Sequence, residues 1–392
     1  MKKIFLKPGR DASIRRFHPW VFSGGVKHIK EEITDGEVVE VYSHENQYLA
    51  TGHFQQSSIL VRIFSFEKTA INQKFWTSKI QKAYHFRRSI GLLDNVETNC
   101  YRLVHAEGDG LPGLIIDVYG STAVVQCHSI GMHQERMKIA EALQEVFGNE
   151  LEAIYDKSVN ALPSKYAATI EDGYIRGESK SQIVKEYGHT FFVDWENGQK
   201  TGFFLDQREN RFFLKKYVEG KNVLNAFCYS GGFSIYALKA GAKLVHSVDI
   251  SQKAIDWTNK NVELNGAFDG EHQAFTNDVL KYLQSSETSY NVMVVDPPAF
   301  AKNKAKRHNA VQGYKRLNAL ALKKIAPNGI LFTFSCSQVV DETLFYNTIT
   351  AAAIEAKRNV RVIQKLTQPS DHPVSLTHPE GAYLKGMVLW VE

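Results

Sequence analysis

Two chemically reactive side chains stand out in the last third of the chain, an aspartate followed by two prolines and a cysteine further on. Asp296 comes directly after Val292–Val295, a short apolar run typical of a buried parallel strand. Two prolines cannot continue a central strand, so Asp296 should lie at the carboxyl edge of the sheet, where open α/β sheets bind ligands. The interval to Cys336 suits one helix and a return strand over Ile330–Ser335. A carboxylate and a thiol should therefore face one crevice.

Three strands earlier in the chain end in residues suited to binding a nucleoside. The residues concerned are, in chain order, Cys228, Tyr229, Ser230, Gly231, Asp249, Asn277 and Asp278. Glycine lets a backbone approach a ligand closely, a carboxylate after the second strand can bind both hydroxyls of a ribose, and acceptors after the third can bind an adenine amino group. Each carboxylate alone could instead be a helix N-cap. Their order, with Asp296 following, predicts S-adenosylmethionine as the cofactor, and the incomplete G-x-G-x-x-G motif disfavours a dinucleotide.

The elements that position these residues alternate between strand and helix from about Lys221 onwards. The predicted strands and helices are Val223–Phe227, a helix from Gly232, Leu244–Asp249, the helix Gln252–Asn265, His272–Thr276, Val292–Val295, Ile330–Ser335 and the helix Thr343–Lys357. The final strands, Val360–Leu366 and Tyr383–Val391, are joined without a helix and should pair antiparallel. The pattern predicts an α/β fold with a doubly wound sheet whose last strand is reversed.

Residues 1–68 form a predicted small β domain. Its candidate strands are Lys3–Leu6, Glu37–Tyr42, Tyr48–Phe54 and Ile59–Phe66. Basic and aromatic residues are interleaved in the segment from Arg10 to Lys30, and such residues bind phosphates and stack on unpaired bases. The candidate RNA contacts are Arg10, Arg15, Arg16, His18 and Trp20. A solvated rim beside a small aromatic core would have the same composition.

Residues 69–188 form a predicted α/β middle domain, and residues 189–392 form the third domain. The predicted elements of the middle domain are the helix Asn72–Ile90, the strands Leu114–Val118 and Ala123–His128, and the helix His133–Phe147. At the start of the third domain, Asn197-Gly198 favours a tight turn between two further strands. The predicted hairpin therefore comprises Thr190–Trp195 and Lys200–Leu205.

The composition is that of an ordinary globular protein. Of its 392 residues, 43% are hydrophobic and 23% are charged, and the net charge of +5 leans only weakly towards an anionic partner. Four cysteines without a C-x-x-C pair suggest neither a disulfide framework nor a zinc site, so no metal is expected. Because the chain lacks a long apolar stretch, we expect a cytoplasmic protein with no membrane partner.

Several runs of the sequence together resemble one known family. They are Arg16–Gly24 (RFHPWVFSG), Glu107–Leu114 (EGDGLPGL), Thr201–Arg208 (TGFFLDQR), the Gly231 loop, Asp296-Pro297-Pro298, Phe334–Ser337 (FSCS) and Asp371–Pro373 (DHP). On these runs the whole chain resembles the RlmI-type methyltransferases, which make 5-methylcytosine in large-subunit rRNA. The resemblance implies an N-terminal PUA-like RNA-binding domain, a connecting middle domain and a C-terminal class I methyltransferase domain. It also implies that Gln207 and Arg208 help to close the cofactor site.

The thiol of Cys336 fits the chemistry of cytosine-5 methylation. Carbon 5 of cytosine is a poor nucleophile until a thiolate adds to carbon 6 and makes carbon 5 enamine-like. After methylation, the adduct loses its carbon-5 proton and expels the cysteine. Cys336 suits the nucleophile, and Asp296 suits the group that holds N3 and the amino group of the base. In the alternative interpretation, Cys336 is a small hydrophobic residue at the end of a strand.

The step that releases the product needs a base. RNA cytosine-5 enzymes with two cysteines carry the second one directly after the proline, but Pro297-Pro298-Ala299 holds no thiol. The loop Thr367–Ala382 should face the crevice, and its candidates are Asp371, His372, His378 and Glu380. By likeness to the single-cysteine uracil-5 methyltransferases, Glu380 is favoured. Each of these residues could instead hold the loop through hydrogen bonds.

Two other functions fit parts of the pattern. Asp-Pro-Pro followed by an aromatic residue also serves methylation of guanine or another nitrogen, where no cysteine is needed, so Cys336 distinguishes the two reactions. The second alternative is a non-catalytic RNA-binding factor for ribosome assembly, which would not need the intact set of Gly231, Asp249, Asp278 and Asp296. The expected partner is large-subunit rRNA, and the chain could act alone or as a homodimer.

Overall fold

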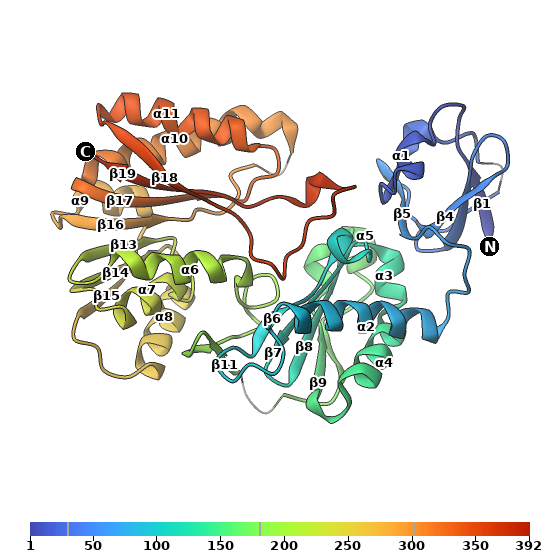
Figure 1. Ribbon diagram of the computed structural model, residues 1–392, viewed down its shortest axis with the longest axis horizontal. Helices are drawn as coiled ribbons and strands as arrows, with labels where there is room; N and C mark the ends of the chain where they lie inside the picture. The colour runs from blue at the N-terminus through green and yellow to red at the C-terminus, as the bar shows by residue number, and fades with distance from the viewer. Residues whose placement is uncertain (30, 180–181, 302) are drawn as a thin grey trace. The chain divides into compact units, whose positions relative to one another are not determined.

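The computed structural model describes residues 1–29, 31–179, 182–301 and 303–392 (Figure 1). Lys30, one end of the basic and aromatic segment, lies outside the described residues. The chain divides into two compact units. Unit 1 comprises Met1–Lys185, Val193–Leu205 and Ser370–Gly381, and unit 2 comprises Glu186–Phe192, Asp206–Pro369 and Ala382–Glu392. The predicted division into three domains stays a prediction.

The first sheet of unit 1 forms near the N-terminus. Its strands lie in the order β1 (Lys2–Phe5), β3 (Val38–Tyr42), β4 (Tyr48–Phe54), β5 (Ile59–Ser65) and β2 (Trp20–Phe22), and the short helix α1 (Ala12–Arg15) contacts β4. The four predicted strands are confirmed to within one residue at each end. The strand β2 was not predicted, because three residues are too few to show an alternating pattern.

The second sheet of unit 1 shares a core with two long helices. Its strands lie in the order β10 (Gly173–Arg176), β9 (Ala153–Asp156), β8 (Thr122–Cys127), β7 (Leu114–Tyr119) and β6 (Cys100–His105). The helices α2 (Gln73–Ser89) and α4 (Arg136–Phe147) pack against each other and against this sheet. The predicted helix over His133–Phe147 is divided at Glu135, because the short helix α3 (Ile130–Gln134) ends there. A further short helix, α5, spans Ser164–Ala167.

The predicted hairpin over Thr190–Trp195 and Lys200–Leu205 is wrong. A hairpin forms earlier in the chain, where β11 (Ile183–Glu186) and β12 (His189–Phe192) make a two-stranded sheet. The turn between them is Tyr187-Gly188, and both residues have positive φ, at 47° and 76°. Positive φ at both central residues is the condition for a tight primed turn, so this pair, and not Asn-Gly, joins the strands.

The sheet of unit 2 confirms the doubly wound fold with a reversed last strand. Its strands lie in the order β15 (Glu271–Thr276), β14 (Leu244–Asp249), β13 (Asn222–Ala226), β16 (Tyr290–Val295), β17 (Ile325–Ser335), β19 (Lys385–Val391) and β18 (Val360–Leu366). From β15 to β17 every neighbouring pair is parallel, whereas β19 is antiparallel to both β17 and β18. The strand order reverses between β13 and β16, which is where such sheets bind ligands.

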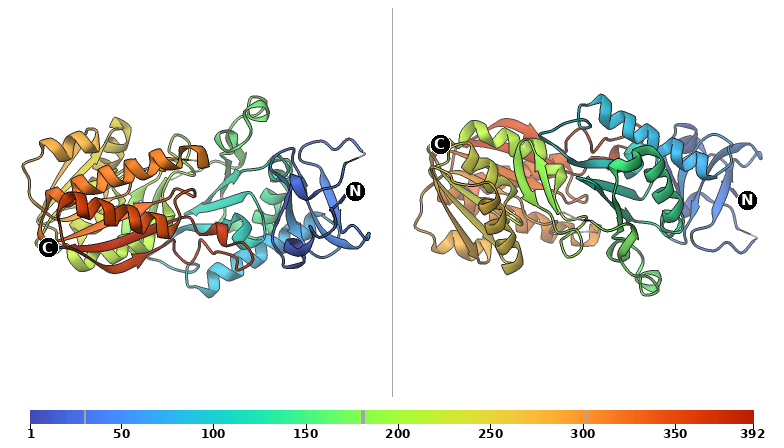
Figure 2. Two further views of the ribbon diagram at one scale, coloured as in Figure 1. Left: turned by 90° about the horizontal axis from the view of Figure 1, so that it is seen from above. Right: turned by 90° about the horizontal axis from the view of Figure 1, so that it is seen from below.

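Helices cover both faces of the unit 2 sheet. One buried cluster lies between the sheet and α9 (Val279–Ser285), α10 (Arg307–Lys324) and α11 (Glu342–Ala356). A second lies between the sheet and α6 (Arg208–Leu214), α7 (Gly232–Lys239) and α8 (Gln252–Leu264). Figure 2 shows the orange and red helices α10 and α11 lying over one face. None of the described helices has the length and apolar composition that a membrane span requires.

Candidate active site

Asp296 and Cys336 follow neighbouring strands of unit 2. The strands β16 and β17 are parallel, with Val295 paired to Thr333. Asp296 comes directly after the last residue of β16, and Cys336 comes directly after the last residue of β17. Both side chains are partly exposed, although the strand residues just before them are buried. The structure thus brings the predicted carboxylate and thiol to the same edge of the sheet.

The segment after β17 holds Cys336 in place. Ser337 Oγ donates at 2.7 Å to a backbone carbonyl of the loop that follows β16, and Lys385 Nζ donates at 2.8 Å to the carbonyl of Ser337. Burial raises the pKa of the Cys336 thiol to about 11, and the carboxylates of Asp296 and Asp206 contribute to this rise. The thiol therefore keeps its proton at neutral pH. A nucleophilic attack by Cys336 requires a neighbouring group that accepts this proton.

The carboxylate of Asp296 shares its surroundings with a glutamine amide. Gln207 Nε2 donates to Asp296 Oδ2 at 2.9 Å, and Asn210 Nδ2 donates to Gln207 Oε1 at 2.6 Å, which fixes the orientation of the amide. Burial raises the pKa of Asp296 from 3.8 to about 7, and the negative charge of Asp206 adds to this effect. Near neutral pH, Asp296 can therefore either donate or accept a proton, as acid–base catalysis demands.

A third titratable residue at this site, Asp206, is not among the predicted site residues. The hydroxyl of Tyr383 donates to Asp206 Oδ2 at 2.7 Å, and Lys385 Nζ donates to the carbonyl of Tyr383 at 2.6 Å. The other oxygen, Asp206 Oδ1, is buried and has no hydrogen-bond partner among the described residues. The sequence feature that could have indicated Asp206 is its place in the run Thr201–Arg208, which supports the family resemblance.

The loop that follows β13 has an unusual backbone. Phe227 and Tyr229 have φ values of 61° and 49°, and Gly231, which directly precedes α7, has a φ of 79°. Non-glycine residues adopt positive φ at a cost, and such conformations gather at ligand sites. A Cβ atom at position 231 would lie 2.8 Å from Thr258 Cγ2, so a larger residue cannot fit without displacing its neighbour.

The polar groups along this loop fit the predicted cofactor. Asp249 Oδ2 accepts the backbone N–H of Tyr229 at 3.0 Å, and Asp249 Oδ1 accepts that of Ser251 at 3.0 Å. Each oxygen keeps a lone pair with which it can accept a ribose hydroxyl. Ser230 Oγ is buried, and within the described part of the chain it has no hydrogen-bond partner. A fixed carboxylate and an orphaned hydroxyl beside a glycine turn are suited to a nucleoside.

The remaining predicted cofactor contacts have varied surroundings. Asn277 donates its backbone N–H to the carbonyl of Asp249 at 2.9 Å, and Asp278 accepts a backbone N–H at 3.0 Å as the N-cap of α9. Cys228 and Arg208 are buried. Their contacts to the cofactor, like that of Gln207, stay predictions.

One exposed side chain beside Asp249 is not among the predicted cofactor contacts. Ile250 directly follows Asp249 and is 73% exposed. When an exposed apolar side chain covers an apolar ligand surface, such as the face of an adenine ring, the free energy decreases because both surfaces leave water. The sequence feature that could have indicated this contact is a β-branched residue directly after Asp249.

The three predicted arginine contacts to RNA, Arg10, Arg15 and Arg16, are exposed on unit 1. Arg15 Nε lies 2.7 Å from a carboxylate oxygen of Asp11, and Arg16 Nε donates to the carbonyl of Ala12 at 3.1 Å. A guanidinium group has five N–H donors, so both arginines can bind phosphate without losing these local bonds. Their RNA contacts stay predictions.

The aromatic residues of the same segment differ in exposure. Trp20 is partly buried, its Nε1 donates to Glu107 Oε1 at 2.8 Å, and its ring lies edge-on to that of His378, with the centroids 4.4 Å apart. Phe17 and Phe22 are 59% and 50% exposed. An exposed ring can stack on an unpaired base without breaking existing contacts, so the two phenylalanines are better placed for stacking than Trp20.

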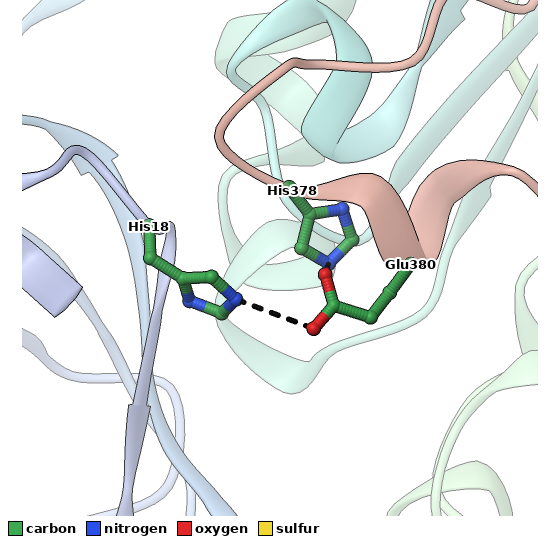
Figure 3. Close-up of side chains that lie close together, drawn as sticks. All are labelled: His18, His378 and Glu380. Carbon is green, nitrogen blue, oxygen red and sulfur yellow. Dashed lines mark ion pairs between the residues drawn. The ribbon is translucent and has the colours of Figure 1, made fainter.

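Figure 3 shows how His18, His378 and Glu380 lie together in unit 1. The carboxylate of Glu380 lies 3.6 Å from His18 Nε2 and 3.9 Å from His378 Nε2. Two histidines and a carboxylate are a common ligand set for a transition metal. However, His18 Nδ1 accepts the backbone N–H of Trp20 at 3.2 Å, so the neutral ring carries its proton on Nε2, the atom that a metal would need. The cluster is thus better suited to ion pairing than to metal binding.

Asp371 and His372 anchor the same segment of unit 1. Both are fully buried, and His372 Nδ1 lies 3.0 Å from Asp371 Oδ1. Asp371 Oδ2 accepts the backbone N–H of Arg102 at 2.9 Å, and the Asp371 carbonyl accepts from Arg87 at 2.7 Å. These bonds match the interpretation in which the loop residues hold the loop. Because Glu380 belongs to unit 1, whereas the thiol site belongs to unit 2, its role as the base stays a prediction.

Comparisons with known proteins define the class of this chain. Residues 4–66 match the family model of a PUA-like domain, and residues 159–387 match that of an S-adenosylmethionine-dependent methyltransferase. A structure described as a SAM-dependent methyltransferase from Streptococcus mutans covers 100% of both chains, with a TM-score of 0.85 and 23% identity. The structure of SMU.776, described as a methyltransferase complexed with SAH, also covers 100% of both chains, with a TM-score of 0.86 and 24% identity. Fold and site thus define an S-adenosylmethionine-dependent methyltransferase.

The relatives narrow this class further. The protein named ribosomal RNA large subunit methyltransferase I from Aeromonas hydrophila is 41% identical, and the match covers 98% of each chain. A protein of the same name from Vibrio cholerae serotype O1 is 42% identical over the same shares. The chain therefore belongs to the ribosomal RNA large subunit methyltransferase I family. The predicted family, cofactor and PUA-like domain are confirmed.

Proposed function

We propose that this protein methylates carbon 5 of a cytosine in large-subunit rRNA through a covalent adduct of Cys336. The observation that carries the proposal is the position of Cys336 and Asp296 at the ends of neighbouring parallel strands. The choice of substrate draws on the name of the relatives, ribosomal RNA large subunit methyltransferase I, and on the PUA-like match. When bound, S-adenosylmethionine supplies the methyl group.

Cys336 and Asp296 act on different atoms of the cytosine ring. The sulfur of Cys336 forms a bond to carbon 6, and the proton that the thiol loses passes through Asp296 to N3, where electron density builds up. N3 releases this proton to water when the product forms. Asp296 can hold a proton near neutral pH, since its pKa is about 7, and it donates a hydrogen bond to N3. Carbon 5 then becomes nucleophilic. After methylation, a base removes the carbon-5 proton, the C5–C6 double bond forms again, and the C6–S bond breaks.

The cofactor is held at the ends of β13, β14 and β15. The ribose contacts are Asp249 and the orphaned hydroxyl of Ser230, and Gly231 gives the ligand close access to the backbone. Asn277 and Asp278 recognise the adenine amino group, and Ile250 covers the ring. The remaining contacts are Cys228, Tyr229, Gln207, Arg208 and Asp296.

RNA is bound by unit 1. Arg10, Arg15 and Arg16 contact phosphates, because arginines with free donors bind phosphate oxygens strongly. Phe17 and Phe22 add stacking on unpaired bases. We place the enzyme in the cytoplasm, whose reducing conditions keep the active thiol free. Assembly into a homodimer stays a prediction.

Methylation of a ring or exocyclic nitrogen is the main alternative. The structure of a tRNA m1G37 methyltransferase from M. jannaschii matches 98% of this chain and 96% of its own with a TM-score of 0.51 and 18% identity. At that similarity only the fold is shared, and this fold serves both kinds of methyl transfer. The presence of Cys336 favours methylation of carbon 5, because a nitrogen atom has its own lone pair and can be methylated without a thiol adduct.

Product analysis separates these functions. The protein is incubated with labelled S-adenosylmethionine and unmodified large-subunit rRNA, and the RNA is digested to nucleosides. We expect the label in 5-methylcytosine. Label in a nitrogen-methylated nucleoside would replace the cytosine-5 assignment. Cofactor binding by calorimetry without any transfer of label would favour an assembly factor.

A further inference from the structure

Among the described residues, Asp206 is a carboxylate that acts electrostatically on Cys336 and Asp296 but to which the proposed function gives no task. It precedes α6 and is followed directly by Gln207, whose amide donates to Asp296 Oδ2 at 2.9 Å. Position along the chain and this hydrogen bond therefore tie the backbone of Asp206 to the carboxylate that is proposed to hold the cytosine.

A second path ties Asp206 to the nucleophile. Its Oδ2 accepts the hydroxyl of Tyr383 at 2.7 Å, and the carbonyl of Tyr383 accepts from Lys385 at 2.6 Å. The same ammonium group donates at 2.8 Å to the carbonyl of Ser337, the residue after Cys336. Two paths of short hydrogen bonds thus fix the carboxylate relative to both reactive groups.

One oxygen of Asp206 is left for another partner. Oδ1 is buried and makes no hydrogen bond to any residue that the structure describes. A buried polar atom without a partner is rare and calls for an explanation, such as a catalytic role. The charge of Asp206 also contributes to the raised pKa values of Asp296 and Cys336, so the three groups interact electrostatically. Oδ1 is therefore available to accept a proton from a bound substrate.

The other polar groups of this edge are less suited to accept a proton from carbon. Asp296 already accepts the amide of Gln207 and is assigned to N3 of the cytosine. Lys385 donates to two carbonyls, and an ammonium group has no lone pair to offer.

We infer that Asp206 is the base that takes the carbon-5 proton and so releases the methylated product. The inference rests on the proposed function. In the methylated adduct the C5–H bond breaks, and its electron pair forms the C5–C6 double bond. The C6–S bond breaks at the same time, and its pair stays on the sulfur of Cys336. The proton on Asp206 then passes to the thiolate, which restores both groups.

Asp206→Asn tests the inference, since an amide keeps an acceptor for Tyr383 but cannot take up the proton. With unmodified rRNA and methyl-labelled cofactor, the variant should transfer the methyl group of the cofactor to the RNA. It should then release the product roughly 10²–10⁴-fold more slowly than wild type. A denaturing gel should show a labelled protein–RNA adduct that disappears in the double variant with Cys336→Ala. Without cofactor, alkylation of Cys336 at pH 8 should become several-fold faster, because a negative charge beside the thiol is gone.

Three results would overturn the assignment. Product release by Asp206→Asn within about threefold of wild type would show that another group takes the proton. A variant that binds cofactor yet forms no adduct would show that Asp206 acts before methyl transfer. Adduct accumulation by Glu380→Gln, with normal release by Asp206→Asn, would assign the base to Glu380.

RNA with 5-fluorocytosine at the target position tests the proposed function separately. Wild type should form a stable adduct with it whichever residue is the base, because fluorine cannot leave as a proton does. Failure of wild type to form this adduct would overturn the cytosine-5 reaction itself, and with it the inference about Asp206.

Discussion

At the scale of single residues, the site depends on titratable groups whose surroundings raise their pKa. Asp296 and Cys336 lie at one sheet edge, where burial, with a contribution from the charge of Asp206, raises the pKa of Asp296 to about 7 and that of Cys336 to about 11. Both shifts favour the protonated forms of Asp296 and Cys336, so each group can give up a proton as bonds form on the substrate. Asp296 and Cys336 could be predicted from the sequence because each follows a recognisable strand. Asp206 lies in the run Thr201–Arg208, but its place beside these groups depends on a long-range hydrogen bond that the sequence does not reveal.

The raised pKa of Asp296 predicts a pH-dependent stability. A group that binds its proton more tightly in the folded state stabilises the fold fully below its ordinary pKa of 3.8, and this contribution is lost as the pH rises through about 7. Between pH 5.5 and 7.5, the wild type should therefore lose about 2 kcal/mol of unfolding free energy relative to Asp296→Asn. Urea denaturation of both proteins at the two pH values measures the difference. Parallel pH profiles would show that the Asp296 carboxyl titrates normally.

At the scale of elements, prediction succeeded where strand and helix alternate and failed where one turn signal stood alone. Asn197-Gly198 does not join two strands, because both residues form a local turn with Asp194. Asp194 Oδ1 accepts the N–H of Asn197, and the Asp194 carbonyl accepts the N–H of Gly198, both at 2.8 Å. The bounds of α10 were also missed. Its buried residues form a narrow stripe in a polar sequence, namely Ala310, Tyr314, Leu317, Asn318, Ala319, Ala321 and Leu322.

The loop after β13 can be tested with two matched glycines. Gly231 and Gly220 both have positive φ, at 79° and 66°, so alanine should cost each about 1–2 kcal/mol of stability. Only at Gly231 does the new Cβ meet a neighbour, Thr258 Cγ2 at 2.8 Å, whereas nothing lies within 4 Å at Gly220. Calorimetry should show weaker S-adenosylmethionine binding for Gly231→Ala and unchanged binding for Gly220→Ala. Equal affinities in the two variants would remove this loop from the cofactor site.

At the scale of the whole molecule, the chain joins a PUA-like domain to a methyltransferase domain. A relative that is 41% identical matches 98% of the chain, and the PUA-like and methyltransferase models match residues 4–66 and 159–387. Composition alone could not predict this, since a net charge of +5 is ordinary for 392 residues. What indicated RNA was the local interleaving of basic and aromatic residues.

The RNA-binding role of unit 1 can be tested with two matched arginines. Arg15 and Arg88 have side chains that are 46% and 50% exposed, and each pairs with an aspartate, Asp11 or Asp94. Arg15→Glu should weaken rRNA binding and reduce the slope of log affinity against log salt by about 1, because one phosphate contact is lost. Arg88→Glu should keep the wild-type slope. If both variants kept it, the basic segment would be a solvated rim.

The central claim is that Cys336 attacks the cytosine, and covalent capture tests it most directly. Wild type and Cys336→Ala are each incubated with S-adenosylmethionine and an rRNA fragment that carries 5-fluorocytosine at the target. After denaturation and digestion, mass spectrometry locates any nucleotide attached to the protein. We predict a nucleotide on the peptide that contains Cys336 in wild type. We predict none in Cys336→Ala, although that variant still binds cofactor. A wild type that methylates rRNA but yields no adduct, or a Cys336→Ala variant with near-normal turnover, would contradict the account.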